Sequence, residues 1–318
     1  MRWFRVYGRG LPWRHDADPY RVLVSEFMLQ QTTVAAVVPY FRRWMGEFPT
    51  VAILATAPEA RVLKMWEGLG YYSRARNLRA AARRIVEDFG GRVPDEYEAL
   101  RSLPGVGPYT ASAVLAFAFD RCVPVIDANI QRVIARLMNF TDPVDSARSR
   151  KAIESAARAM LPAQSGAAHT AALMDLGSLV CRAGVPVCAS CPVRRFCKAV
   201  DPSCIPVKRR KAEVIREVDV RGFSMSRGNL RLVRSEGPRW RGLWTLPKVR
   251  PAGRLLAETD YTVTRHRIRL EVYAVRPERG WGAFSTASLP AMPSPHRRAV
   301  EQILAASQGG EILSAMSR

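Results

Sequence analysis

Apolar residues recur at helical spacing through the first two thirds of the chain. The run from Tyr20 to Met45 follows this spacing and is broken near residues 31–33. Glycine and proline residues separate the later helical segments. We expect these further helices at 50–66, 73–89, 95–102, 109–119, 127–138, 147–160 and 166–180. The pattern shows no internal repeat of fixed period, so it predicts a mainly α-helical domain over residues 1–198.

The pattern changes after residue 198. Residues 199–212 hold two prolines and a Lys/Arg run, which predicts a linker that can lie along DNA. Beyond it, residues 213–223, 230–235 and 261–275 alternate apolar and polar side chains, as half-buried strands do. A last helix is expected at 295–306. Residues 213–318 therefore predict a small mixed α/β domain.

Length and charge narrow the class of protein. A chain of 318 residues is long enough for two domains with separate cores. Lys and Arg number 49 against 28 Asp and Glu, and this net charge of +21 is spread along the whole chain. Such an excess favours a polyanionic partner over a basic protein that binds nothing. No long amphipathic basic helix with an exposed aromatic face stands out, so nucleic acid is preferred to a membrane surface.

The chain has no run of the roughly 18–20 apolar residues that a membrane helix needs. Its N-terminal segment is basic but lacks the continuous apolar stretch of a secretory signal. We therefore expect a soluble cytoplasmic protein, nucleoid-associated if bacterial, that contacts no membrane.

Four of the six cysteines are clustered. Cys181, Cys188, Cys191 and Cys197 fall within 17 residues, whereas Cys122 and Cys204 stand alone. In a cytosolic protein this clustering indicates a metal centre rather than disulfides. Four thiolates at these intervals can hold one iron–sulfur cluster. Zinc is the alternative, although its sites usually present two short-spaced cysteine pairs.

Two glycines mark the connection at residues 103–111, which lies between two helical patterns. Gly105 and Gly107 allow a tight turn and a close approach of the backbone to a ligand. The amides of the turn and of the next helix N-terminus would then face an anion. An ordinary Pro/Gly helix connection is the alternative.

Two carboxylates stand out. Glu26 lies in an otherwise apolar stretch, Val22–Leu29, where it is either a surface residue or an acid with a raised pKa. Asp127 lies about 20 residues past the glycine turn, at the start of the next predicted helix, where it is favoured as an N-cap. A partly desolvated Glu suits general acid catalysis near neutral pH, and a fixed carboxylate suits stabilisation of a positive charge that develops during a reaction.

Several segments together resemble the MutY family of adenine DNA glycosylases, which belongs to the helix-hairpin-helix superfamily of endonuclease III. VSEFMLQQTTV at 24–34 resembles the SEVMLQQT signature of that family, and LPGVGPYTA at 103–111 resembles its DNA-gripping hairpin. The cysteine spacing is that of its iron–sulfur loop. Further similar segments are GRGLPWRHDADPY at 8–20, EGLGYYSRARNL at 67–78, MDLGSLVC at 174–181, RGLWTLP at 241–247 and LPAMPSPHRR at 289–298. The resemblance covers almost the whole chain.

The resemblance implies a helix-hairpin-helix glycosylase domain with an iron–sulfur cluster loop, followed by a MutT-like domain that recognises 8-oxoguanine. Glu26 would be the acid that protonates adenine, and Asp127 would face the sugar. Tyr109 would pack at that sugar, and Asn129 would help orient the site. The cofactor would be a [4Fe-4S] cluster on the four clustered cysteines. Residues 213–318 lack the paired glutamates of a nucleotide-hydrolysing Nudix box. The C-terminal domain would therefore recognise the oxidised guanine and would not hydrolyse nucleotides.

The family also implies which residues contact DNA. The stretch after Glu26 enters the duplex, Tyr71 wedges beside the oxidised guanine, and the hairpin glycines grip a phosphate. The tryptophan and arginine of the LPWR segment and one loop of the C-terminal domain complete the surface. The implied contacts are Trp13, Arg14, Leu29, Gln30, Gln31, Thr32, Tyr71, Gly105, Gly107, Thr264 and His266.

The chain departs from the family at three places. Ala128 stands where the family has Gly between the Asp and Asn, and related thymine-mismatch glycosylases carry Ala there. Ala171 replaces an acidic or amide side chain that touches adenine. Thr264 keeps the hydroxyl of a Phe-Ser-His loop, but His266 is displaced by one residue.

We therefore expect a monomeric, monofunctional base-excision enzyme that hydrolyses the N-glycosidic bond of adenine mispaired with 8-oxoguanine or guanine in double-stranded DNA. A mismatch glycosylase for thymine or uracil is the main alternative, favoured by Ala128 and Ala171. A glycosylase with lyase activity is disfavoured because Tyr109 replaces the lysine of those enzymes. A non-enzymatic iron–sulfur protein that binds DNA would need no acid at position 26.

Overall fold

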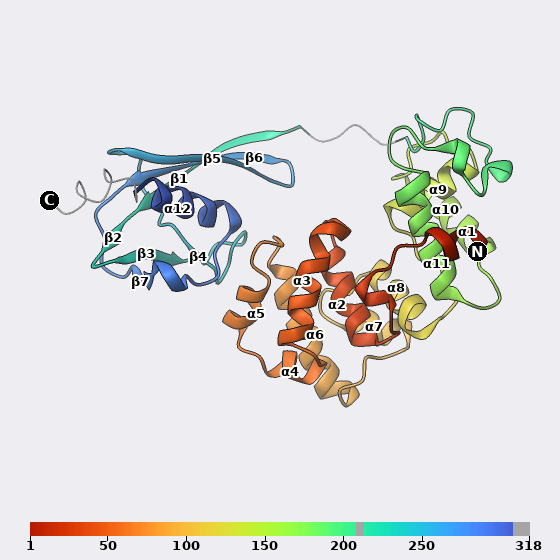
Figure 1. Ribbon diagram of the computed structural model, residues 1–318, viewed down its shortest axis with the longest axis horizontal. Coiled ribbons are helices and arrows are strands. Elements are labelled where there is room, and N and C mark those ends of the chain that lie inside the picture. Colours follow the sequence, from red (N-terminus) through yellow and green to blue (C-terminus); the bar gives the residue numbers. More distant parts are fainter. Residues whose placement is uncertain (208–212, 308–318) are drawn as a thin grey trace. The chain divides into compact units, whose positions relative to one another are not determined.

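The computed structural model describes residues 1–207 and 213–307, and Figure 1 shows its elements. The chain divides into two compact units. One combines Met1–Ala57 with Asn77–Arg210, and the other combines Pro58–Arg76 with Lys211–Arg318. Residues 58–76, which the sequence pattern assigns to the helical domain, thus group with the C-terminal residues. Residues 208–212 of the predicted linker and 308–318 of the predicted C-terminal domain lie outside the described residues.

The first unit is helical, as the apolar spacing predicts. Its α-helices are α1 (Arg2–Tyr7), α2 (Pro19–Leu29), α3 (Val34–Glu47), α4 (Val51–Thr56), α7 (Tyr97–Ser102), α8 (Pro108–Phe119), α9 (Ala128–Leu137), α10 (Ala147–Ala159) and α11 (Gly166–Asp175), and α6 (Ser73–Phe89) lies mostly within it. A π-helical turn, Leu176–Val180, continues α11. Short 3-10 turns cover Pro12–Arg14, Cys188–Ser190 and Arg194–Phe196.

Local sequence explains where these helices begin and end. Asp18 and Asp127 cap α2 and α9 through their side chains. The predicted break near residue 31 is confirmed, because Gln31 has a φ of 57° between α2 and α3. The single helix expected over 50–66 is instead α4 and α5 (Glu59–Met65), because Pro58 disfavours helical backbone at Ala57. The short helix α1 was not predicted.

The α7–α8 hairpin follows the glycine pattern only in part. Gly105 has a φ of 78°, a conformation that favours glycine. Gly107, the N-cap of α8, has a φ of −85°, which any residue adopts. An added Cβ at Gly105 would lie 2.7 Å from the Asn77 Cβ, whereas one at Gly107 would meet nothing within 4 Å. The turn therefore requires glycine at position 105 and not at position 107.

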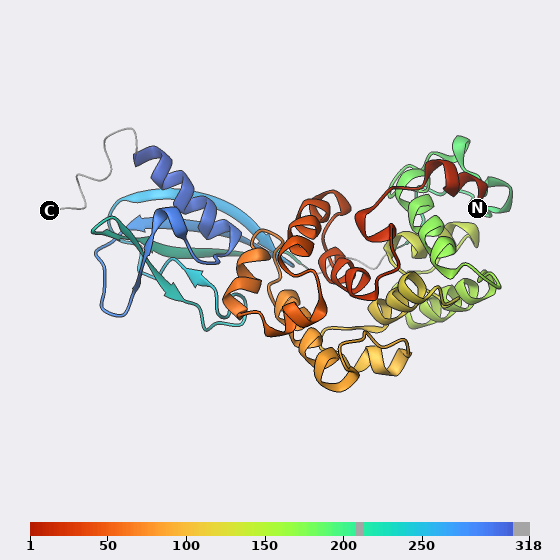
Figure 2. The same ribbon diagram turned by 60° about the horizontal axis from the view of Figure 1, so that its bottom comes forward.

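The second unit contains two small sheets. β1 (Ile215–Phe223), β6 (His266–Ala274) and β5 (Leu255–Val263) form one in the order β1-β6-β5, with β1 parallel and β5 antiparallel to β6. In the other sheet, β3 (Asn229–Arg234) pairs with β2 (Met225–Ser226), β4 (Trp244–Thr245) and β7 (Gly282–Ser285). Helix α12 (Ser294–Ser307) packs across the β1-β6-β5 sheet (Figure 2). The sequence missed the short strands β2, β4 and β7.

The core of this second unit is formed by apolar side chains of both sheets and α12. Leu230, Leu232 and Leu270 are fully buried there with Met292 and Val300. The expected fold class of a helical domain followed by a smaller sheet-containing domain is confirmed at this level. Among the described residues, no helix has both the length and the apolar character that crossing a membrane requires.

We predict that Gly105→Ala lowers the free energy of unfolding by about 2 kcal/mol or more, because the new Cβ meets Asn77 and Phe27 at a positive φ. Gly107→Ala should change it by less than about 0.5 kcal/mol, since its Cβ enters open space. Urea denaturation of both variants measures the difference. Equal destabilisation would contradict this division between the two glycines.

Candidate active site

A cavity of about 800 Å³ lies within the helical unit. Its wall includes the four side chains that the sequence nominates for catalysis: Glu26, Tyr109, Asp127 and Asn129. They come from three different parts of the chain. Helix α2 carries Glu26, the first turn of α8 carries Tyr109, and the start of α9 carries the other two.

Glu26 is a buried carboxyl with one hydrogen-bond partner. The residue is 3% exposed, and the Tyr109 hydroxyl donates a hydrogen bond to it. Burial raises the pKa of Glu26 to about 7, and the negative charge of Asp127 adds to this effect. The Tyr109 hydroxyl and the more weakly acting Arg14 oppose it. Within the described part of the chain, Glu26 Oε2 is buried and has no hydrogen-bond partner.

Tyr109 keeps its proton in this setting. Burial raises the pKa of its phenol well above the usual value, and the charges of Glu26 and Asp127 act in the same direction. The hydroxyl therefore remains a donor at neutral pH. The ring also packs beside the core formed by α8, α9 and α10.

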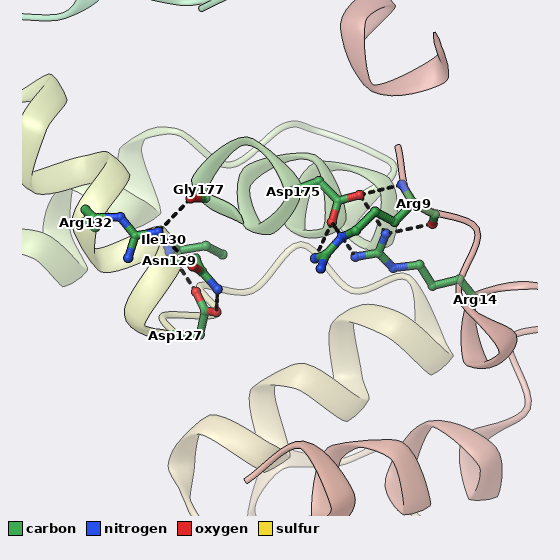
Figure 3. Close-up of polar contacts among 8 residues, drawn as sticks. All are labelled: Arg9, Arg14, Asp127, Asn129, Ile130, Arg132, Asp175 and Gly177. Carbon is green, nitrogen blue, oxygen red and sulfur yellow. Dashed lines mark hydrogen bonds and ion pairs between the residues drawn. The ribbon is translucent and has the colours of Figure 1, made fainter. Parts of the chain in front are cut away.

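Asp127 is fixed by the helix that it caps. Its Oδ1 accepts a hydrogen bond of 2.7 Å from the Ile130 backbone, and its Oδ2 accepts one of 2.8 Å from Asn129 Nδ2 (Figure 3). Asn129 in turn accepts 2.8 Å from Arg132, whose guanidinium also donates to the Gly177 carbonyl. The carboxylate is thus held by its own helix and, through Asn129, by the turn after α11.

The same helix contacts the cysteine loop. Arg132 Nε donates 2.7 Å to the Cys181 carbonyl. Arg136, which is almost fully buried, donates to the carbonyls of Arg182 and Gly184 and lies 3.3 Å from Cys181 Sγ. A buried guanidinium therefore lies beside one of the four clustered sulfur atoms.

The four clustered cysteines lie near one another. Burial raises the pKa of Cys191, and the thiols of Cys181, Cys188 and Cys197 contribute to the shift. Among residues 1–207 and 213–307, no group of three or more His, Cys, Asp or Glu side chains is arranged to hold a single metal ion. The loop therefore offers four neighbouring sulfurs and a buried cation.

Two arginines at the cavity wall share one buried carboxylate. Asp175, at the end of α11, has no exposed side-chain surface. It accepts 2.8 Å bonds from the Arg9 backbone and Nε, and bonds of 2.9 and 3.1 Å from Arg14 (Figure 3). Burial opposes its ionisation, but the hydrogen bonds from Arg14 and Arg9 lower its pKa below the usual range. The two arginines are therefore fixed by one carboxylate, which offsets one of their two positive charges.

The rim of the cavity contains the residues that follow Glu26. Gln30 Nε2 lies 3.5 Å from the Thr110 hydroxyl, and Thr32 Oγ1 donates to the Gln30 carbonyl. Leu29 and the exposed Gln31 lie at the same rim. Trp13 also lines the cavity, but its ring is mostly buried edge-on against Phe41.

One wall of the cavity lacks polar side chains. Helix α11 contributes Ala167, Ala168, Ala171 and Met174 to it. Ala171 stands where the family resemblance implies an acidic or amide side chain. Its methyl group cannot form a hydrogen bond with a base. The polar groups of the lining come instead from α2, α8, the start of α9 and the N-terminal segment that carries Arg9 and Arg14.

The predicted C-terminal contacts lie in the second unit. Thr264 has a φ of 52° in the β5–β6 turn and is exposed, and its hydroxyl donates to the Val263 carbonyl. His266 Nδ1 lies 2.6 Å from Glu217 Oε1, so its side chain already has an acidic partner. Tyr71 belongs to this unit as well and is exposed.

The cavity can support proton transfer and charge stabilisation. A carboxyl with a pKa near 7 donates a proton at neutral pH, and a fixed carboxylate beside it stabilises developing positive charge. None of the residues that line the cavity is a lysine, so this wall offers no side-chain amine for a Schiff base.

Sequence reasoning missed the groups that orient the site. Arg9, Asp175, Arg132 and Arg136 were not nominated as site residues. Asp175 is part of the MDLG segment, to which the family resemblance assigns no site residue. Its distance of 161 residues from Arg14 along the chain hides the contact from any local pattern.

Residues 24–161 match a family model described as the HhH-GPD superfamily of base excision DNA repair proteins. An adenine DNA glycosylase of Mycobacterium tuberculosis is 40% identical over 228 residues, which cover 70% of this chain and 74% of the relative. The adenine DNA glycosylase of Rattus norvegicus is 43% identical over 209 residues, 63% of this chain and 40% of the relative. The matched part of the chain thus spans about 40% of the length of such mammalian relatives.

Solved structures resemble the helical part. A thermostable thymine-DNA glycosylase is 31% identical with a TM-score of 0.56, covering 60% of this chain and 88% of that protein. A trapped covalent intermediate of endonuclease III with DNA is 26% identical with a TM-score of 0.53, covering 62% and 90%.

We predict that Glu26→Gln becomes more stable relative to the wild type as the pH rises. The folded-state pKa of about 7 exceeds the ordinary 4.5, so wild-type stability falls between these pH values, where the unfolded chain has lost the proton that the folded protein still holds. Between pH 5 and pH 8 the variant should gain about 2 kcal/mol on the wild type in urea denaturation. Glu87→Gln, at an exposed position of α6, is the matched control and should show no such trend. A constant difference for Glu26→Gln would contradict the raised pKa.

Proposed function

This chain belongs to the MutY family of adenine DNA glycosylases, and from this premise we propose that it removes adenine mispaired with 8-oxoguanine or guanine in double-stranded DNA. The observation that carries the proposal is the burial of Glu26 beside Tyr109 and Asp127 at the wall of one cavity. This arrangement supplies a protonated acid at neutral pH next to a fixed negative charge.

Chemistry begins with a base that has left the stack. The glycosidic bond is not accessible within the duplex, so the target nucleotide must enter the cavity. Glu26 donates its proton to a ring nitrogen of adenine, which makes adenine a neutral leaving group. The bond between the sugar and adenine then breaks, and both bonding electrons go to the base.

The sugar is left with positive charge that Asp127 stabilises. Asn129 Nδ2 donates a hydrogen bond of 2.8 Å to that carboxylate, and the Tyr109 hydroxyl donates one to Glu26. Water then attacks the sugar, and the ionised Glu26 takes the released proton. The product is an abasic site with an intact strand, because no lysine lines the cavity to form a Schiff base.

The DNA-binding surface in this proposal combines three parts of the helical unit. The open space around Gly107, at the N-terminus of the twelve-residue helix α8, suits a backbone phosphate. Leu29, Gln30, Gln31 and Thr32 at the cavity rim would meet the bases. Arg182, Arg194, Arg195 and Lys198 are exposed on the cysteine loop and would contact phosphates. Trp13 and Arg14 would act at the cavity wall and not at an exposed surface.

We also propose that Cys181, Cys188, Cys191 and Cys197 hold a [4Fe-4S] cluster. The neighbouring thiols and the Arg136 guanidinium at 3.3 Å from Cys181 Sγ fit a thiolate-bound cluster. Its role would be to fix the loop that carries the four basic residues.

For the C-terminal domain we propose a MutT-like role in recognising the base opposite adenine. Thr264 has the exposed position that such a contact needs. His266 would first have to give up or share its contact with Glu217. The aromatic ring of Tyr71 offers a stacking surface for the same base.

A second candidate is a mismatch glycosylase that removes thymine or uracil. Two observations favour it. The α11 wall has alanine at position 171, and the sequence Asp127-Ala128-Asn129 is that of thymine-mismatch glycosylases. A thymine-DNA glycosylase is also among the similar solved structures.

Glu26→Gln should slow adenine release by 10²-fold or more, since general acid catalysis typically contributes about 10²–10⁴-fold. The wild-type rate should fall above about pH 7, as Glu26 loses its proton, and the residual rate of the variant should lack this dependence. Single-turnover assays on duplexes with A or T opposite 8-oxoguanine or G, followed by alkali, measure both effects.

Binding of Glu26→Gln to a duplex with an uncleavable adenine analogue should stay near the wild-type level, which separates chemistry from affinity. Glu87→Gln is again the control. Near wild-type release by Glu26→Gln would refute the mechanism, and release of thymine in place of adenine would favour the second candidate.

Protein purified without oxygen should contain about four irons per chain, and Cys188→Ser should lose them. Cys204→Ser and Cys122→Ser are matched controls and should keep the wild-type iron content, because neither belongs to the clustered set. Iron analysis and the absorption of the brown protein measure this. Stoichiometric zinc without iron would overturn the cluster assignment.

A further inference from the structure

The loop that carries Tyr71 is conformationally strained. Gly68, Gly70 and Tyr71 have φ values of 103°, 71° and 46°. The left-handed conformation is costly for a tyrosine, so the surrounding structure must hold it in place. Tyr71 is 42% exposed at this point of the loop.

Both ends of this loop bind the same buried residue of the C-terminal domain. Before the loop, Glu67 Oε1 accepts a hydrogen bond of 2.9 Å from the Met292 backbone N–H. After it, the Tyr72 hydroxyl donates 2.8 Å to the Met292 carbonyl. Met292 is 0% exposed and belongs to the core that the two sheets form with α12. The residues on both sides of the loop, Glu67 and Tyr72, are therefore hydrogen-bonded to the same buried residue, Met292.

Glu67 has further partners in the same unit. Arg297 of α12 donates to its Oε1 at 2.7 and 3.0 Å, and Lys64 donates to its Oε2 at 2.7 Å. Lys64 also donates to the Leu289 carbonyl, and Arg297 to the Pro290 carbonyl. One carboxylate thus joins α5, α12 and the 289–292 segment through charge-assisted bonds.

The underside of the loop is filled by Arg74. Its guanidinium donates to the carbonyls of Leu69 and Gly70 and lies 5.7 Å from the centre of the Tyr71 ring. A rigid aromatic ring in this setting makes a defined stacking surface.

We propose that Glu67 and Tyr72 are positioning residues for Tyr71, so that the C-terminal domain acts on recognition of the base opposite adenine through this loop. The inference rests on the proposed function. It adds a second route by which this domain contributes, separate from any direct contact by the β5–β6 turn.

The test uses the full protein with Glu67→Ala, Tyr71→Ala and the double variant. Adenine release is measured under single-turnover conditions opposite 8-oxoguanine and opposite G. Glu67→Ala should lower the ratio of the two rates by roughly tenfold, because it removes several charge-assisted bonds. The double variant should be no worse than Tyr71→Ala alone, since both act through the same ring. Glu67→Gln, which can still accept from Met292, should retain most of the preference.

Asp88→Ala is the matched control, because it removes an exposed ion pair with Arg84 in α6 and should leave the ratio unchanged. Hydrogen exchange of the amides of residues 68–72 gives a readout that needs no activity. It should speed up in Glu67→Ala and not in Asp88→Ala. Should Glu67→Ala not fold, Tyr72→Phe removes only the hydroxyl that binds Met292 and should show the same two changes.

The inference would be overturned if Glu67→Ala left either the ratio of the two release rates or the hydrogen exchange of residues 68–72 unchanged. It would also be overturned if the double variant lowered the rate ratio by the product of the two single effects. A wild type that releases adenine equally from both duplexes would overturn it too. Failure of the proposed function would appear differently, as wild-type protein that releases no adenine from either duplex.

Discussion

The buried carboxyl of Glu26 is the constraint on which the cavity depends. An ionised carboxylate without water or a cation is costly, so burial raises the pKa of Glu26 until a substantial fraction keeps its proton at neutral pH. The surrounding helix faces must exclude water and still leave one Glu26 oxygen, Oε2, without a hydrogen bond to the described residues. Arg14 is close enough to lower the pKa of Glu26, but Asp175 takes two hydrogen bonds from its guanidinium. The negative charge of Asp175 offsets part of the positive charge of Arg14, so Arg14 lowers the pKa of Glu26 less than burial raises it.

Helix α9 connects this chemistry with the cysteine loop. Asn129, Arg132 and Arg136 follow one another at spacings of three and four residues, so they lie on one face of the helix. The first holds Asp127, the second bonds the turn at Gly177, and the third bonds the loop beyond Cys181. An added Cβ at Gly177 would come within 2.7 Å of the Asn129 Cβ. Only glycine lets the π-helical turn approach α9 this closely.

The sequence predicts the features whose cause is local. Apolar spacing locates α2, α3 and α6 to α10, and an acidic residue in an apolar stretch identifies Glu26. The cap position of Asp127 also follows from its place before a helical pattern. Pairs far apart in the chain cannot be found in this way. Asp175 meets Arg14 across 161 residues, and Glu67 meets Met292 across 225. The grouping of residues 58–76 with the C-terminal unit has the same origin, because it depends on side chains that no local period relates.

The apolar α11 wall bears on the choice of base more than on the acid itself. Protonation by Glu26 assists any base that departs through a basic ring nitrogen, and adenine has such a nitrogen where thymine does not. Tyr109 and Asp127, which act on the pKa of Glu26 in opposite directions, belong to α8 and to the start of α9, whereas Ala171 belongs to α11. In the proposed mechanism, alanine at position 171 would therefore remove one means of orienting the base and leave the proton donor in place. Such a cavity would keep the chemistry suited to adenine, while selection of the base would depend more on the polar rim at Gln30 and on contacts made outside the cavity.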